Sequence, residues 1–163
     1  MRAELVFSGI NVYAENEVFP DAGVVVADGC IADIGKVKAK KTQDVVTLPS
    51  GWHLIPGMID MHVHGAAGVD VMDATPKALA TMSSALLREG VTGFLPTTMT
   101  AAYEDITAAL ENIKGYVADD FHAGAQILGV NLEGPFLAPA KAGAQIAGKM
   151  LPPNINLFKS LQK

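Results

Sequence analysis

Apolar runs alternate with amphipathic segments from residue 54 onward, and this alternation limits the possible folds more than any other feature of the sequence. The strand candidates are the mainly apolar residues 54–61, 91–95 and 127–132. Between them lie residues 76–89 and 101–117, whose apolar side chains recur at helical spacing. Strands separated by helices predict a parallel sheet covered by helices, with right-handed crossovers. We therefore expect an α/β fold.

Both helix predictions have supporting detail. Thr75 can cap the first helix, Pro76 suits its first turn, and Gly90 can end it. The expected buried stripes are Leu79, Met82 and Leu86 in the first helix, and Ile106, Ala109, Leu110, Ile113 and Val117 in the second. Such stripes indicate scaffold core rather than cofactor contacts. A further short helix is expected at residues 157–161.

The beginning of the chain has the pattern of a β structure. The expected strands are residues 5–13, 24–27, 30–34 and 45–48. Asp28 and Gly29 form the two-residue signal of a tight hairpin. The charged residues 36–41 are expected to form a solvated turn. We therefore divide the chain into a β segment, residues 1–52, and a strand–helix segment, residues 53–163.

Composition narrows the function classes. Half of the 163 residues are apolar and 18% are charged, which favours a folded core. The net charge of -5 disfavours nucleic acid and anionic membranes as partners. No run approaches the roughly 18 apolar residues of a membrane span. The one cysteine, Cys30, allows no intrachain disulfide, so we expect a cytoplasmic protein in which Cys30 is a small buried hydrophobe.

The first candidate site lies at the end of the apolar run 54–61. Alternate side chains of a strand share a face, so Asp60, His62 and His64 are expected to project to one side. Two imidazoles on one strand can bind a single divalent cation such as Zn²⁺ or Fe²⁺. Asp60 could orient a ligand histidine. The simpler interpretation is a pair of polar residues where a strand passes into a loop.

Glu133 is the second candidate. It ends the expected strand 127–132 and is followed by Gly134 and Pro135. The carboxyl ends of strands are where α/β barrels carry their chemistry. Alone, Glu133 would be interpreted as a solvated loop acid. With His62 and His64 on a neighbouring parallel strand, it becomes the expected third metal ligand.

Other polar residues give weaker signals. His53 and His122 are expected on the solvent side of the fold. Thr97 and Thr98 end a strand and could line the site, although structural roles explain them equally well. Gln145 lies in a loop of small residues whose backbone could approach a ligand closely, with a plain flexible loop as the default interpretation.

Several of these segments resemble a known family. Residues 55–65, Ile-Pro-Gly-Met-Ile-Asp-Met-His-Val-His-Gly, resemble the first-strand signature of the amidohydrolase superfamily. Leu-Glu-Gly-Pro-Phe at 132–136 and Lys-Ala-Gly-Ala-Gln at 141–145 resemble the N-acetylglucosamine-6-phosphate deacetylase family in particular, and residues 93–97 fit it. The resemblance implies the N-terminal portion of a metal-dependent (β/α)₈ hydrolase barrel, about three strands, preceded by part of a small β-sandwich.

The resemblance also implies an activity. The expected reaction is metal-dependent hydrolysis of the N-acetyl group of N-acetylglucosamine 6-phosphate, which yields glucosamine 6-phosphate and acetate. It implies one or two ions, Zn or Fe, with His62, His64 and Glu133 as ligands. The loop positions Ala144 and Gln145 are expected to contact this small amino-sugar phosphate. Members of the family tend to be homodimers.

The family's catalytic aspartate and two further histidines lie on later strands and have no counterpart in residues 1–163. No catalytic residue is therefore assigned, and we expect the isolated chain to be inactive. A different amidohydrolase, such as a dihydroorotase-like or imidase enzyme, would share the metal site, although residues 132–136 favour the deacetylase. The chain could instead be a non-catalytic remnant or a small metal-binding module.

Overall fold

The computed structural model describes residues 5–39, 43–119 and 123–162, and the chain forms two compact units, Met1–Pro56 and Gly57–Lys163. Each unit has its own cluster of buried apolar side chains. His122 lies outside the described residues, as do two residues of the charged run 36–41. The expectations for them therefore stay predictions.

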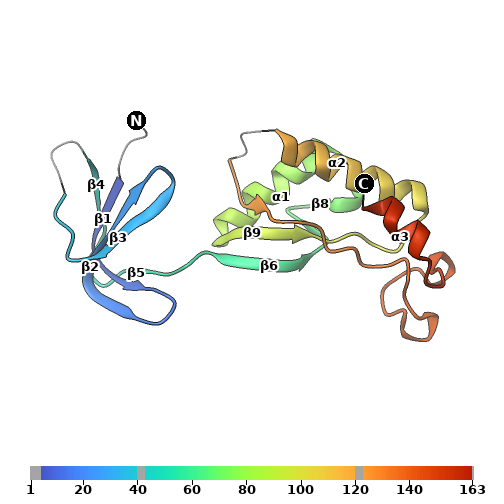
Figure 1. The fold of residues 1–163 in the computed structure, drawn as a ribbon, viewed down its shortest axis with the longest axis horizontal. Helices are drawn as coiled ribbons and strands as arrows, with labels where there is room; N and C mark the ends of the chain where they lie inside the picture. The colour runs from blue at the N-terminus through green and yellow to red at the C-terminus, as the bar shows by residue number, and fades with distance from the viewer. Residues whose placement is uncertain (1–4, 40–42, 120–122, 163) are drawn as a thin grey trace. The chain divides into compact units, whose positions relative to one another are not determined.

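The first unit is built on one mixed sheet of five strands (Figure 1). Its strands are β1 (Leu5–Tyr13), β2 (Val18–Ala27), β3 (Cys30–Gly35), β4 (Asp44–Thr47) and β5 (His53–Leu54). The order is β3-β2-β1-β4, and β5 pairs with β1. Strand β2 is antiparallel to both neighbours, whereas β4 and β5 run parallel to β1. Buried residues of β1 and β2, among them Ile10 and Val24, form its core.

The turn between β2 and β3 is the predicted tight hairpin. Asp28 and Gly29 both adopt positive φ, 51° and 79°, as this turn type requires. The expected burial of Cys30 is wrong, because its side chain is exposed. Cys30 is the first residue of β3, which lies at the edge of the sheet and directly after the turn.

The second unit begins with a strand and alternates strands with helices. Its regular elements are β6 (Met58–Val63), β7 (Gly65–Ala66), β8 (Val69–Asp70), α1 (Pro76–Arg88), β9 (Val91–Pro96), α2 (Tyr103–Ala118), β10 (Gln126–Ile127) and α3 (Ile155–Leu161), with 3-10 turns η1 (Val71–Asp73), η2 (Pro139–Lys141) and η3 (Ala147–Lys149). Strands β10, β9 and β6 form a parallel sheet in that order, and α1 and α2 lie along the same side of it (Figure 1). The predicted α/β class is confirmed.

Helix α1 follows its prediction closely. The Thr75 hydroxyl accepts the N–H of Ala78 at 3.2 Å and so caps the helix. Leu79, Met82 and Leu86 are buried in the core with Phe94 of β9.

Helix α2 differs from its prediction at two positions. Ile106, Ala109 and Ile113 are buried as expected, but Leu110 is only half-buried and Val117 is 53% exposed. Tyr116 is buried in its place. The spacing explains the exposure of Val117. Residues 106, 109, 113 and 116 are separated by three, four and three positions and so share one face of the helix, whereas residue 117 lies a further 100° around the helix from residue 116.

The strand predicted at residues 127–132 is shorter in the structure, where β10 covers only Gln126–Ile127. Regular pairing with β9 covers only β10, although the chain continues beside β9 as far as an isolated parallel bridge between Thr97 and Asn131. Pro96 lies in this stretch and has no N–H to donate, so the ladder of hydrogen bonds cannot be continuous there. Its carbonyl still accepts the N–H of Asn131 at 3.1 Å.

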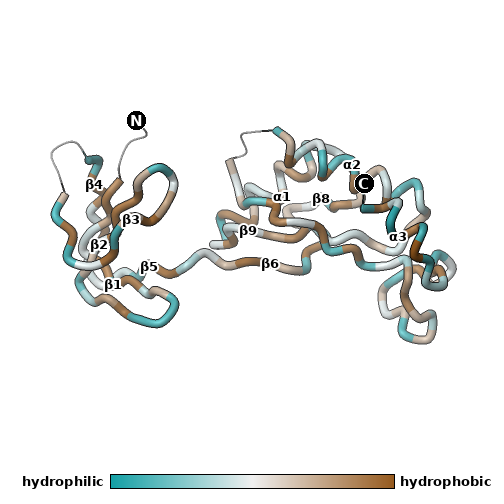
Figure 2. The backbone as a smooth tube through the Cα atoms, viewed as in Figure 1, coloured by the Kyte–Doolittle hydropathy of each residue, from teal (hydrophilic) through white to brown (hydrophobic). Residues whose placement is uncertain are grey.

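Strand β9 is mainly white to brown in Figure 2, whereas β6 combines four apolar residues with Asp60 and His62. Three apolar side chains of β6, those of Met58, Ile59 and Met61, are nevertheless more than half exposed. In the described part of the chain, no helix combines the length and the apolar character needed to cross a membrane.

Candidate metal centre

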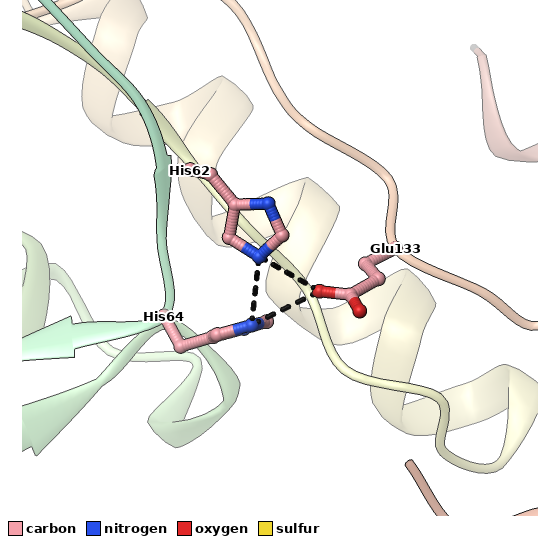
Figure 3. Close-up of side chains that lie close together, drawn as sticks. All are labelled: His62, His64 and Glu133. Atoms are coloured by element: carbon pink, nitrogen blue, oxygen red, sulfur yellow. Dashed lines mark hydrogen bonds and ion pairs between the residues drawn. The ribbon is translucent and has the colours of Figure 1, made fainter. Parts of the chain in front are cut away.

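Three predicted ligands meet at the carboxyl-end edge of the parallel sheet, from β6 and from the segment that follows β10, with β9 between these two strands. His62 belongs to β6, His64 follows its last residue, and Glu133 comes shortly after β10 (Figure 3). Glu133 Oε2 lies 2.9 Å from His62 Nε2 and 3.0 Å from His64 Nε2, and the two nitrogens are 3.2 Å apart. The side chains therefore offer one ligand atom each to a common point.

This cluster is open toward solvent on one side. The side chain of His62 is 56% exposed, whereas those of His64 and Glu133 are 31% and 27% exposed. The rings of His62 and His64 meet edge to face, with centroids 5.0 Å apart. A cation held here could thus be reached by a small molecule.

Backbone contacts fix the orientation of His64. Its Nδ1 atom lies 3.1 Å from the carbonyl oxygen of Thr97. Since a carbonyl oxygen can only accept, Nδ1 carries the hydrogen, which leaves Nε2 as the nitrogen that can present a lone pair to a cation. Metal-binding histidines commonly have this second contact.

The donor set fits a divalent cation. Glu133 Oε2 is buried and, among the described residues, has no hydrogen-bond partner, because neither short contact to a histidine has hydrogen-bond geometry. Two acceptor atoms, Glu133 Oε2 and His64 Nε2, thus lie 3.0 Å apart. Ligands bound at about 2.0–2.2 Å around one tetrahedral Zn²⁺ lie roughly 3.3–3.6 Å from each other, so the three atoms found 2.9–3.2 Å apart need to separate only by a few tenths of an ångström to hold the ion.

Asp60 acts on the backbone rather than on an imidazole ring. Its Oδ1 atom accepts the N–H of His62 at 3.0 Å. This contact holds the strand end that carries His62 and His64.

Thr97 and Thr98 are fully buried. The Thr97 hydroxyl accepts the N–H of Val63 at 3.0 Å and donates to the carbonyl of Leu95 at 3.1 Å, so it ties β9 to the end of β6. Asn131, which the sequence interpretation missed, has a similar role, since its Nδ2 donates to the carbonyl of Met61 at 3.3 Å. Its signal was a polar residue on an apolar strand, two positions before Glu133.

Gln145 is buried, and its side chain is engaged within the protein. Its Oε1 accepts the N–H of Thr100 at 2.7 Å, and its Nε2 lies 3.4 Å from the sulfur of Met99. The adjacent Ala144 is exposed. His53, in the first unit, is exposed as expected and packs its ring against Tyr13.

A sequence model of the amidohydrolase family matches residues 53–156, a range that contains all three residues of the cluster. The chain belongs to the amidohydrolase family.

Individual relatives agree with this assignment. The chain is 39% identical over 166 residues to an N-acetylglucosamine-6-phosphate deacetylase of Bacillus subtilis strain 168, a match that covers 100% of this chain and 42% of that protein. It is 42% identical over 137 residues to an N-acetylgalactosamine-6-phosphate deacetylase of Escherichia coli O157:H7, covering 84% of this chain and 33% of the relative.

A solved structure is also similar. The N-acetylglucosamine-6-phosphate deacetylase of Pasteurella multocida superposes with a TM-score of 0.84 at 25% identity, over 97% of this chain and 41% of that one. The 163 residues therefore span about two fifths of the length of the Bacillus and Pasteurella proteins.

Proposed function

We propose that this chain contributes a divalent-metal site to an amidohydrolase that removes the acetyl group from an N-acetylated amino-sugar 6-phosphate. The observation that carries the proposal is the convergence of His62 Nε2, His64 Nε2 and Glu133 Oε2 within 3.2 Å of one another. The names of the Bacillus and Escherichia relatives support the substrate class.

The finer architecture is part of the same proposal. The β segment of residues 1–52, which lies within the first unit, would be part of a small β-sandwich. The second unit would supply the first strands of a (β/α)₈ barrel. The parallel order β10-β9-β6 supports this, because successive barrel strands pair in parallel with their neighbours.

Each residue of the cluster has a distinct task in this proposal. His62 and His64 supply neutral nitrogen ligands, and Glu133 supplies negative charge that offsets part of the charge of the ion. Zinc and iron both suit this donor set. A divalent ion bound there polarises an amide carbonyl and activates water for hydrolysis. Thr97 keeps His64 in the tautomer that can bind the ion.

The substrate contacts belong to the loop after Glu133. We propose that the exposed backbone at Ala144 contacts the amino-sugar phosphate, with Gln145 beside it. The two relatives act on sugars that differ in name, one a glucosamine and the other a galactosamine derivative. Both sugars are therefore candidate substrates.

Metal binding by the purified chain tests the site. Co²⁺ titration, followed by visible absorption, should show saturable binding that the variants His62→Ala, His64→Ala and Glu133→Ala weaken by at least about tenfold. His53→Ala is the matched control, because this exposed histidine belongs to the first unit, and it should bind Co²⁺ like the wild type. Equal affinity in all five proteins would overturn the proposed site.

Acetate release tests the reaction. The protein expressed from its complete reading frame and loaded with Zn²⁺ or Fe²⁺ should release acetate from N-acetylglucosamine 6-phosphate or its galactosamine isomer. His62→Ala and Glu133→Ala should reduce kcat/KM by at least about a hundredfold. Hydrolysis of dihydroorotate or cyclic imides, without acetate release from either sugar, would favour a dihydroorotase-like or imidase enzyme.

A further inference from the structure

Four consecutive backbone N–H groups at the end of β9 donate to four different parts of the second unit. They belong to residues 97–100, here called the 97–100 segment. The acceptors, in order, are Val63 O at 2.9 Å, Asn131 O at 3.1 Å, Met72 Sδ at 3.4 Å and Gln145 Oε1 at 2.7 Å. This segment has no regular hydrogen-bond ladder of its own. It is held by β6, by the residues that follow β10, by η1 and by the loop after Glu133.

The segment is buried and lies against the metal centre. Thr97, Thr98 and Thr100 have no measurable exposure. The Thr97 carbonyl receives the Nδ1 hydrogen of His64, which sets the direction of His64 Nε2. The conformation of the 97–100 segment therefore determines where one metal ligand points.

Gln145 makes the shortest of the four contacts, and it is the only acceptor among them that a side-chain oxygen provides. It is 9% exposed and 45 residues distant from Thr100 in the chain. A buried N–H that loses its acceptor is costly, so without Gln145 the segment is expected to rearrange toward another acceptor or toward water.

We infer that Gln145 is a positioning residue for the metal centre: it holds the N–H of Thr100, and through the 97–100 segment it sets the orientation of His64. The inference rests on the proposed metal site. It gives the buried amide of Gln145 a role within the protein that is separate from substrate contact. It also links the loop after Glu133 to the metal, so that a change in one affects the other.

Two substitutions separate the acceptor from the bulk of the side chain. Gln145→Met keeps a similar length but removes the oxygen, whereas Gln145→Glu keeps an oxygen that can accept the N–H of Thr100. Co²⁺ affinity should fall at least about tenfold in Gln145→Met, the lower end of the loss typical when the hydrogen-bond support of a ligand histidine is disturbed, here through the Thr97 carbonyl. In Gln145→Glu it should stay within about threefold of the wild type, and the visible spectrum of bound Co²⁺ should change only in the methionine variant.

Gln126→Met makes the same glutamine-to-methionine replacement at an exposed position in β10, and this control variant should bind Co²⁺ like the wild type. Equal affinities and spectra for Gln145→Met and the wild type would overturn the inference. So would equal losses in the methionine and glutamate variants, because the accepted hydrogen bond would then not be the cause. Absence of Co²⁺ binding by the wild type would instead overturn the proposed metal site itself.

A second measurement applies if Gln145→Met does not fold. In the wild-type chain, Zn²⁺ should slow hydrogen exchange at the amides of Thr97 and Thr100 by at least about tenfold, since the ion stabilises the arrangement in which they are bonded. Exchange at the amide of Val24, a buried residue of β2 in the first unit, serves as the reference, because the ion does not bind that unit. No selective slowing at Thr97 and Thr100 would contradict the inference.

Discussion

Glu133 can reach the histidines because the residue after it is a glycine. Gly134 has φ +80°, a conformation that side chains with a Cβ adopt at a cost. A Cβ built there would lie 2.0 Å from Thr100 Oγ1 and 3.0 Å from Thr100 Cβ. The backbone after Glu133 is therefore packed directly against the 97–100 segment, and no side chain fits between them.

Replacing this glycine should disturb both stability and metal binding. Gly134→Ala is expected to lower the free energy of unfolding by about 2–4 kcal/mol, from backbone strain and overpacking together. It should also weaken Co²⁺ binding, because relief of the clash moves Glu133. Urea unfolding and Co²⁺ titration measure the two effects.

Gly148→Ala provides the matched control for this substitution. A Cβ at Gly148 meets no atom within 4 Å, so its stability should change by less than about 0.5 kcal/mol. If Gly134→Ala were as stable as Gly148→Ala, the close packing of Gly134 against Thr100 would be wrong.

The sequence was most informative where the chemistry is local. Alternation along one strand was enough to place His62 and His64 on one face, and the end of the third apolar run indicated Glu133. The partner of Gln145 could not be predicted in this way, because no periodicity relates residues 45 positions apart. Asn131 was missed for the same reason, since its acceptor on Met61 is 70 residues away.

At the scale of elements, helix α1 shows a single side chain defining where a helix begins. Thr75 has extended backbone angles, and its hydroxyl satisfies the N–H of Ala78. Thr75→Ala should lower the free energy of unfolding of the second unit by about 1 kcal/mol, the usual effect of losing such a cap. Circular dichroism at 222 nm during urea unfolding measures the change.

Thr81 supplies the control for this cap. It lies inside α1, where its hydroxyl donates to the carbonyl of Lys77 at 2.9 Å. Thr81→Ala removes a contact that is not needed to begin the helix and replaces threonine with a better helix former, so its stability should be unchanged or slightly higher. A larger loss in Thr81→Ala than in Thr75→Ala would contradict the capping argument.

The elements that were predicted wrongly share a physical cause. Helix ends and edge strands depend on neighbours that a local pattern does not contain. Val117 was expected to be buried, yet the final turn of α2 turns Tyr116 toward the core instead. The strand predicted at residues 127–132 pairs regularly with β9 only as far as Ile127. The interruption comes from Pro96, which belongs to β9 and not to the predicted strand.

At the scale of the whole molecule, the two units carry separate spectroscopic reporters. Trp52, the one tryptophan of the chain, belongs to the first unit. All α-helices among the described residues, and all three residues of the metal cluster, belong to the second. Tryptophan fluorescence and helical circular dichroism therefore follow different parts of the chain.

This division predicts which unit a metal stabilises. An ion that binds only the folded second unit should raise its free energy of unfolding by about 2.7 kcal/mol when free Zn²⁺ is a hundred times its Kd. The 222 nm transition should move to higher urea, and His62→Ala, with at least about tenfold weaker binding, should reduce the stabilisation to about 1.4 kcal/mol or less at the same Zn²⁺ concentration. A shift confined to Trp52 fluorescence would contradict the site, since the ion would then bind the unit that contains none of the three ligands. Movement of both transitions by the same amount would show that the two units unfold as one, with the metal bound in the second.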